Sequence, residues 1–176
     1  MDALPDPEPV KLLIAVLFSH EPSLDAALSM AASSWGPLDH RSEDRHFDVT
    51  DYYESEMGPR LHRRIVSFHR LVPPDVLPRA KRECVEIEGA HREDGERRVN
   101  LDVGYLDHNK VVLASTKPAG QKVYLEGGVW ADIQGRYTKE RYAPLDWTFP
   151  DFADGRYDTD LARIRARYLE QLRKGG

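Results

Sequence analysis

Lys11-Leu-Leu-Ile-Ala-Val-Leu-Phe18 is the stretch that decides the fold, because it is a short and continuous apolar run. A run of this kind predicts a central strand that is covered on both faces. The next segment predicts a helix, since Pro22 stands where a first-turn proline is tolerated and Gly36-Pro37 is a stop signal. Its apolar residues recur at helical spacing and are Leu24, Ala27, Leu28, Ala31 and Trp35. The chain therefore opens as a strand followed by a helix.

Four further segments extend this order. The polar stretch 41–48 predicts a weak edge strand, and 61–71 predicts a stronger one. A second helix starts at Pro73-Pro74-Asp75 and ends at Gly89. Residues 99–105 alternate between apolar and polar, which predicts a half-buried strand. The six elements in this order match the split β-α-β-β-α-β arrangement of a ferredoxin-like core.

The remaining chain predicts C-terminal β-hairpins and a closing helix. Residues 111–114 form a hairpin with the strand before them, and Gly127-Gly128 turns a second hairpin. The segment 142–157 is punctuated by aromatic residues and proline, and predicts irregular chain. A helix capped by Asp158 or Thr159 closes the chain. The predicted fold class is therefore α+β, with a ferredoxin-like split βαββαβ core, C-terminal β-hairpins and a closing helix.

Length and composition restrict the organisation of the protein. The 176 residues fit one domain, and we expect a flexible leader over 1–9 and a single α+β domain over 10–176. A net charge of −5 argues against nucleic acid as a partner. No apolar run approaches the roughly 20 residues that span a bilayer, so we expect no membrane partner. The one cysteine, Cys84, lies on the apolar face of its helix and predicts a buried thiol in a cytoplasmic protein.

Seven short segments of this sequence, taken in order, resemble motifs of the bacterial family called domain of unknown function 4416. The resemblance covers the chain from about Val10 to the C-terminal helix. Members of that family are sometimes labelled GTP-binding proteins, so the resemblance implies a nucleotide, GTP among the candidates. The segments that carry the resemblance are Lys11–Ser19, Phe47–Gly58, Val66–Phe68, Arg98–Leu106, Val112–Lys117, Tyr124-Leu125 and Leu145–Asp151.

The sequence departs from what a conventional GTPase needs. No Gly-x4-Gly-Lys-Ser/Thr phosphate loop occurs in it. Ser115-Thr116-Lys117 has a lysine but no glycine-rich approach, and Asn109-Lys110 is not followed by the aspartate that reads guanine. Any nucleotide would therefore be bound by another geometry.

The first candidate site is a ligand-binding set made of Asp102, Tyr105, Ser115, Thr116 and Lys117. If the hairpin register brings them to one face, Lys117 would neutralise an anion. Ser115 and Thr116 would donate hydrogen bonds to that anion, and Asp102 would orient the lysine or a hydroxyl. The simpler interpretation is a surface ion pair at an ordinary strand end, which contributes little to stability.

The second candidate is a metal set made of Asp48, Asp51 and Glu54. Asp51 and Glu54 share a helical face within the short helix predicted over 50–57. Oxygen ligands of this kind would hold a hard cation such as Mg²⁺. The simpler interpretation is a capped helix start. In it the side chain of Thr50 or Asp51 caps the first turn of the helix, and Glu54 makes the reciprocal contact of a capping box.

Three functions follow from these sets. The preferred one is a small anionic ligand or nucleotide, bound without a P-loop. The second is a metal-dependent enzyme that processes a phosphate ester at the acidic set. The third is a protein-interaction module that uses the segment Trp147–Tyr157, with no small ligand. Fold alone does not choose among them.

Overall fold

The computed structural model describes residues 4–175 and is built around one large antiparallel sheet. Its nine strands run in the order β11-β10-β8-β7-β1-β4-β2, with β3 paired to β4 and β9 paired to β10. The helices are α1 (Glu21–Trp35), α2 (Glu54–Met57), α3 (Leu77–Ala90), α4 (Pro150–Ala153) and α5 (Asp158–Arg173), with a 3-10 turn over Pro74–Val76. The main strands are β1 (Val10–Phe18), β4 (His62–Val72), β7 (Val99–Leu106), β8 (Lys110–Ser115) and β10 (Val129–Thr138). The shorter strands are β2 (Leu38–Arg41), β3 (Arg45–His46), β9 (Val123–Glu126) and β11 (Arg141–Ala143).

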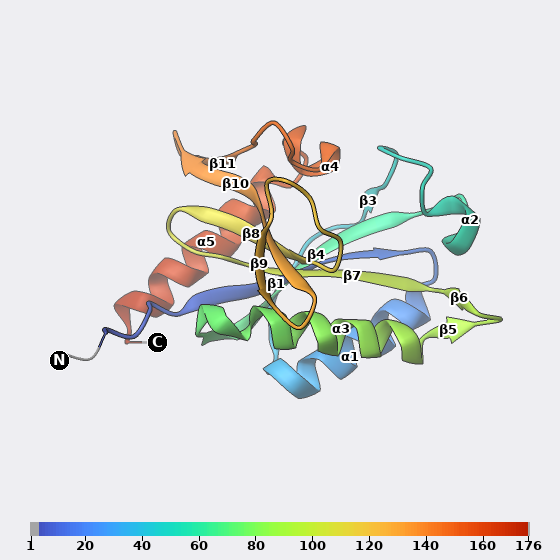
Figure 1. Cartoon of the computed structure of the whole chain (residues 1–176), viewed down its shortest axis with the longest axis horizontal. Coiled ribbons are helices and arrows are strands. Elements are labelled where there is room, and N and C mark those ends of the chain that lie inside the picture. Colours follow the sequence, from blue (N-terminus) through green and yellow to red (C-terminus); the bar gives the residue numbers. More distant parts are fainter. Residues whose placement is uncertain (1–3, 176) are drawn as a thin grey trace.

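The predicted central strand is confirmed. β1 pairs antiparallel with β4 on one side and with β7 on the other, and all nine of its residues are buried. Helices α1 and α3 lie together against one face of the sheet, whereas α4 and α5 lie on the opposite side (Figure 1). Each face of β1 therefore contacts a separate layer of apolar side chains.

The two layers use alternate residues of the same strands. Leu12, Ile14 and Val16 pack toward α1 and α3, whose predicted apolar faces are buried, and Cys84 is a buried free thiol in that layer. Leu13 and Ala15 pack toward α5, the predicted closing helix. The surroundings of each strand side chain therefore depend on which of the two layers it faces.

Several predicted elements need correction. The weak edge strand expected over 41–48 is two short strands, β2 and β3. The segment 91–98 forms a separate two-stranded hairpin, β5 (Arg92–Glu93) with β6 (Glu96–Arg97). The supposedly irregular segment 142–157 contains α4 and the end of β11, and the predicted helix 50–57 is reduced to α2. β7 is not half-buried, because Asn100, Gly104 and Leu106 on its second face are buried as well as the apolar residues of its first face.

The predicted leader falls partly outside the described residues, which begin at Leu4. Its last two residues contact the closing helix, because the Tyr168 hydroxyl donates to the Pro9 carbonyl oxygen at 2.9 Å and to a Glu8 carboxylate oxygen at 3.2 Å. Within residues 4–175, no helix combines the length and the apolar character needed to cross a membrane.

One irregularity of the sheet positions the candidate site. β7 and β8 pair only through Gly104–Leu106 and Val111–Leu113, next to their connecting turn. At Gly104 a Cβ atom would lie 2.0 Å from the Val112 carbonyl oxygen, so this close approach requires glycine. Beyond Gly104 the two strands are no longer paired, and the sheet is open between them.

Candidate functional site

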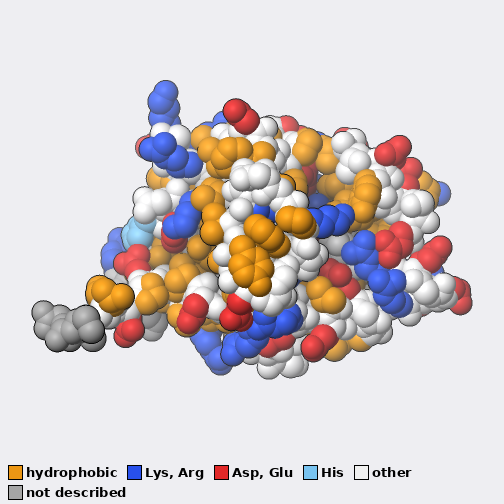
Figure 2. Space-filling model, in the orientation of Figure 1, with side chains coloured by type: hydrophobic (Ala, Val, Ile, Leu, Met, Phe, Trp, Pro, Cys, Tyr) orange, Lys and Arg blue, Asp and Glu red, His pale blue; other side chains and the backbone are white. Residues whose placement is uncertain are grey.

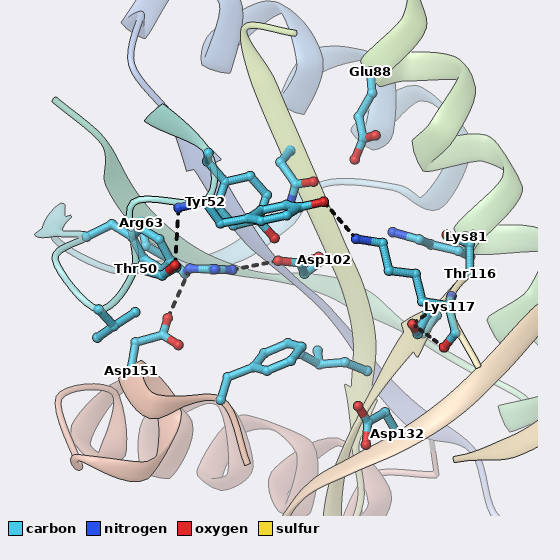
Figure 3. Close-up of a pocket in the computed structure, with 18 of the residues that line it drawn as sticks. Thr50, Tyr52, Arg63, Lys81, Glu88, Asp102, Thr116, Lys117, Asp132 and Asp151 are labelled. Carbon is cyan, nitrogen blue, oxygen red and sulfur yellow. Dashed lines mark hydrogen bonds and ion pairs between the residues drawn. The ribbon is translucent and has the colours of Figure 1, made fainter. Parts of the chain in front are cut away.

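A cavity of about 610 Å³ occupies the gap between β7 and β8 (Figure 3). Its volume is in the range of small-molecule sites. Its walls are supplied by strands β4, β6, β7 and β10, the end of β8 with the loop after it, helix α3, the loop before α2, and the chain that enters α4. Five basic side chains line it, Arg63, Lys81, Arg97, Lys117 and Lys122, together with four acidic ones, Glu88, Asp102, Asp132 and Asp151.

Side chains of α3 replace the missing strand partner of β7. The Leu101 N–H donates to Glu88 Oε1 at 2.6 Å, and Lys81 Nζ donates to the Leu101 carbonyl oxygen at 3.1 Å. Burial raises the pKa of the Glu88 carboxyl above its ordinary value. Two charged side chains of a helix thus satisfy a backbone edge that β8 would otherwise have covered.

Lys81 is a buried cation with few partners. The residue is 7% exposed, and among residues 4–175 no carboxylate oxygen lies within 4.0 Å of its amino group. Its hydrogen bond to Leu101 uses one of three N–H donors. A buried ammonium group normally has an ion-pair partner, because transfer of an unpaired charge out of water is costly. The cavity wall therefore presents a buried positive charge that no carboxylate among residues 4–175 contacts directly, although this charge also acts on the nearby carboxyl groups of Glu88 and Asp102.

A buried ion network forms another part of the wall. Arg63 is 2% exposed, and its guanidinium lies 2.8 Å from Asp102 Oδ2 and 3.1 Å from Asp151 Oδ2. The Tyr157 hydroxyl donates to the same Asp151 oxygen at 2.9 Å. Burial alone would raise the pKa of Asp102, but the charges of Arg63 and Lys81 outweigh it and hold that pKa below its ordinary value. Asp102 is therefore ionised and already paired.

A third cluster ties β10 to the loop after β8. Lys122 Nζ donates to Ser115 Oγ at 2.9 Å and to the Lys117 carbonyl oxygen at 3.0 Å, and it lies 3.7 Å from Asp132 Oδ2. Asp132 is 2% exposed, and burial raises the pKa of its carboxyl. With three acceptors around it, the Lys122 amino group holds the loop in place.

The predicted ligand set is brought together in part. Asp102, Ser115, Thr116 and Lys117 line the same cavity, whereas Tyr105 faces the opposite side of the sheet and lines a separate hollow of about 300 Å³. Lys117 Nζ donates to the Tyr52 hydroxyl at 3.0 Å rather than pairing with Asp102. Figure 3 shows the Lys117–Tyr52 contact and the Arg63–Asp102 contact on different sides of the cavity, so Asp102 is paired with Arg63 and not with Lys117. The alternative role expected of Asp102, orienting a hydroxyl, stays a prediction.

The predicted metal set is not assembled. Within residues 4–175, no three His, Cys, Asp or Glu side chains are grouped closely enough to hold a metal ion. Asp48 instead accepts a hydrogen bond from Arg156 at 2.8 Å, and this contact lowers the pKa of its carboxyl. Of the surrounding segment, Thr50, Tyr52 and Tyr53 line the cavity. The segment 47–53 therefore contributes a wall of the cavity and no metal centre.

The segment proposed for protein interaction is mostly internal. Phe152 and Tyr157 are buried in the layer beneath α5, although Trp147 is exposed. Exposed apolar side chains gather on β9, at Val123, Tyr124 and Leu125. Figure 2 shows these side chains as an orange cluster on the surface in front of the sheet.

Comparison with known proteins gives one match. The model of a family described as Domain of unknown function (DUF4416) matches residues 8–168, which include every residue that lines the cavity. The chain belongs to this family. No curated protein and no solved structure matches the chain. The description of DUF4416 assigns no activity, so the function of this member is argued from its own cavity.

Sequence reasoning missed several cavity residues of this DUF4416 protein. Lys81 and Glu88 follow Leu77 at four and eleven residues, on the face that also carries Cys84. Charged residues on an apolar helical face were a readable signal of a buried polar site. Asp132 gave a weaker signal, because alternation along β10 also fits a solvent-facing position.

Proposed function

We propose that this protein binds a small anionic ligand that carries a phosphate group in the cavity between β7 and β8. One observation supports this most strongly: Lys81 is 7% exposed and has no carboxylate within 4.0 Å among residues 4–175. An anion in the cavity would supply the missing counter-charge and would accept the unused N–H groups.

The four predicted ligand residues that line the cavity each receive a role. Lys117 lies at the exposed mouth of the cavity and would neutralise the anion together with Lys81. The exposed Thr116 hydroxyl would donate to the anion, whereas Ser115 is occupied by Lys122 and would hold the loop in place. Asp102 would keep Arg63 in position beneath the ligand. Lysine side chains would thus take the part that backbone N–H groups play in a P-loop.

A nucleotide, GTP among the candidates, is the finer form of this proposal. A cavity of about 610 Å³ has room for a molecule of that size. Phe47, Tyr53 and Phe149 add aromatic surface to the cavity, which suits a planar base. In this proposal the partner is a small molecule and neither nucleic acid nor a membrane.

The finer fold assignment is also a proposal. We propose that β1, α1, β2, β4, α3 and β7 constitute a ferredoxin-like split βαββαβ core. Support comes from the strand order β7-β1-β4-β2, in which each neighbouring pair is antiparallel, and from α1 and α3 lying on one face. An experimental structure that superposes these six elements on a ferredoxin-like domain would test the assignment.

The cellular location of the protein is also part of the proposal. We propose a cytoplasmic protein, because the chain has one cysteine and that cysteine is a buried free thiol. Cell fractionation followed by detection of the native protein tests this location directly, and recovery in a secreted fraction would contradict it.

The two alternative functions stand differently. The hypothesis of a metal-dependent enzyme is no longer supported by the acidic set, because Asp48, Asp51 and Glu54 do not form a metal site. The interaction module now has a different surface, the exposed side chains of β9. Light scattering of the purified protein, with and without the change Tyr124→Ser, would reveal self-association through that surface.

A thermal-shift screen tests the proposed function. The panel contains inorganic phosphate, pyrophosphate and the nucleoside mono-, di- and triphosphates, each with and without Mg²⁺. A ligand at about 100 times its Kd stabilises the folded state by about 2.7 kcal/mol, and this raises the Tm. If no phosphate compound changes the Tm at millimolar concentration, the proposal is wrong.

Two variants sharpen the screen. Lys81→Met should abolish the ligand-induced shift, and it should also destabilise the free protein by about 1–3 kcal/mol, because the buried Leu101 carbonyl loses its donor. Arg79→Met is the matched control, since Arg79 lies on the same helix, is exposed and does not line the cavity. A full ligand response in Lys81→Met would remove Lys81 from the site.

A further inference from the structure

One side of the cavity mouth is formed by the segment 48–58, which joins β3 to β4 and contains α2. The last backbone hydrogen bond before the segment runs from the Phe47 N–H to the Leu61 carbonyl oxygen at 2.8 Å. Within the segment, backbone groups bond only to one another, as the Glu54 N–H does to the Asp51 carbonyl oxygen, and none bonds to another part of residues 4–175. A segment with so few ties to the fold opens at a small cost in free energy.

The two ends of the segment are nevertheless held by side chains. Asp48 accepts a hydrogen bond from Arg156 at 2.8 Å. Glu56 accepts two from the guanidinium of Arg97, at 2.9 and 2.8 Å, and the neighbouring Met57 is buried in a small apolar cluster. The free part of the segment is therefore its exposed tip, residues 50–52.

The tip makes one hydrogen bond to another part of the described chain. Lys117 Nζ donates to the Tyr52 hydroxyl at 3.0 Å and lies 4.8 Å from the centre of the Tyr52 ring. Figure 3 shows the two side chains extending toward each other from different walls of the cavity. Both residues are exposed, Tyr52 by 62%, so water competes with this contact.

The same two side chains can hold an anion together. The Tyr52 oxygen accepts from Lys117, and among residues 4–175 its own O–H proton has no acceptor. Lys117 likewise keeps N–H groups that the tyrosine does not use. Hydrogen bonds to a charged phosphate oxygen are stronger than those between neutral groups, so a phosphate at the mouth would attract both donors. The tip would then be tied to the ligand as well as to Lys117.

Resting on the proposed function, we infer that the segment 48–58 is a lid over the cavity and that Tyr52 is the ligand-binding residue that closes it. In the free protein a single exposed hydrogen bond holds the tip, so the lid opens and admits the ligand. With the ligand bound, Lys117 and the Tyr52 hydroxyl both donate to its phosphate group. The lid is then fixed, and it covers the mouth of the cavity.

Electron paramagnetic resonance of a spin label on the tip tests this inference. The label is attached to Asp51→Cys, an exposed position that does not line the cavity, and it spares Cys84 because that thiol is buried. Saturating inorganic phosphate should broaden the spectrum, because the lid becomes fixed. The matched control is a label at Glu86→Cys, which loses the same charge at an exposed position of α3 outside the cavity. Its spectrum should not change.

The variant Tyr52→Phe tests the residue that closes the lid. It keeps the ring but removes the hydroxyl, so the affinity for inorganic phosphate, measured by isothermal titration calorimetry, should fall about 10-fold or more. In the same background the label at position 51 should stay mobile when phosphate is added. Tyr124→Phe, at an exposed position of β9 outside the cavity, is the control and should change neither result.

The outcomes separate the lid from the proposed function. If no phosphate compound raises the Tm, the proposed function fails, and the lid fails with it. If a phosphate compound raises the Tm but the label at position 51 stays mobile in inorganic phosphate, the site stands and the lid is wrong. Parental affinity of Tyr52→Phe for inorganic phosphate would also overturn the inference. The label and the affinity are measured on different variants, so each result is decisive even if the other variant does not fold.

Discussion

Arg63 lies between the carboxylates of Asp102 and Asp151 and is almost completely buried. Removing the guanidinium leaves two buried acids without their cation, and breaking a buried ion pair in this way costs about 3–5 kcal/mol. We therefore expect Arg63→Met to lower the free energy of unfolding by about that amount at neutral pH. Urea unfolding followed by circular dichroism measures it, and Arg60→Met, at an exposed position outside the cavity, is the control.

The pH dependence of the same variant provides a second readout. The pKa of Asp102 is lower in the folded protein than in the unfolded chain, so its ionised form stabilises the fold above about pH 4. That contribution is lost as the pH falls through the folded pKa. The difference between Arg63→Met and the parent should therefore shrink in acid, and a difference that stays constant between pH 7 and pH 3 would show that Asp102 is not the partner that matters.

At the scale of elements, the gap between β7 and β8 depends on their close contact at Gly104. A Cβ atom there would lie 2.0 Å from the Val112 carbonyl oxygen and 2.7 Å from Leu113 Cδ2. Gly104→Ala should therefore force the strands apart at their last paired position and destabilise the protein by about 1–3 kcal/mol or more. The same displacement should weaken ligand binding, because Leu113, Ala114 and Ser115 follow directly in the cavity wall.

Gly120→Ala is the matched control for this change. A Cβ atom at Gly120 has no heavy atom within 4 Å, and its backbone does not need a left-handed conformation. Its Tm should equal or slightly exceed that of the parent, because alanine reduces the freedom of the unfolded chain. Equal stability of the two variants would mean that β8 can move away from β7 without cost.

At the scale of the whole molecule, one sheet packs against two apolar layers, one on each face. β1 contributes alternate residues to both layers, so neither layer can lose its packing while the other keeps an intact sheet. We therefore expect a single cooperative unfolding transition, as a one-domain protein of this size usually shows. Far-ultraviolet circular dichroism and tryptophan fluorescence, which reports on Trp35, Trp130 and Trp147 together, should give coincident urea curves. An earlier transition of the C-terminal layer would contradict the single domain.

The sequence by itself determined the elements whose pattern is local. The continuous apolar run of β1, the helical spacing in α1 and α5 and the apolar face that buries Cys84 each depend on residues a few positions apart, and each is present. Side-chain alternation also placed Asn100 and Asp102 on one face of β7. It could not show that Asp102 joins a buried ion network there, because that network also needs Arg63 and Asp151, which are far away in the sequence.

Only the tertiary structure decided the site. Asp102 pairs with Arg63, which lies 39 residues earlier, and not with the nearer Lys117. That choice depends on two strand registers and on the point at which β7 and β8 separate, and no local pattern encodes either. Lys81 enters the site for the same reason: a backbone edge without a partner strand must be satisfied by whatever donor packs beside it, and α3 is the helix that lies there.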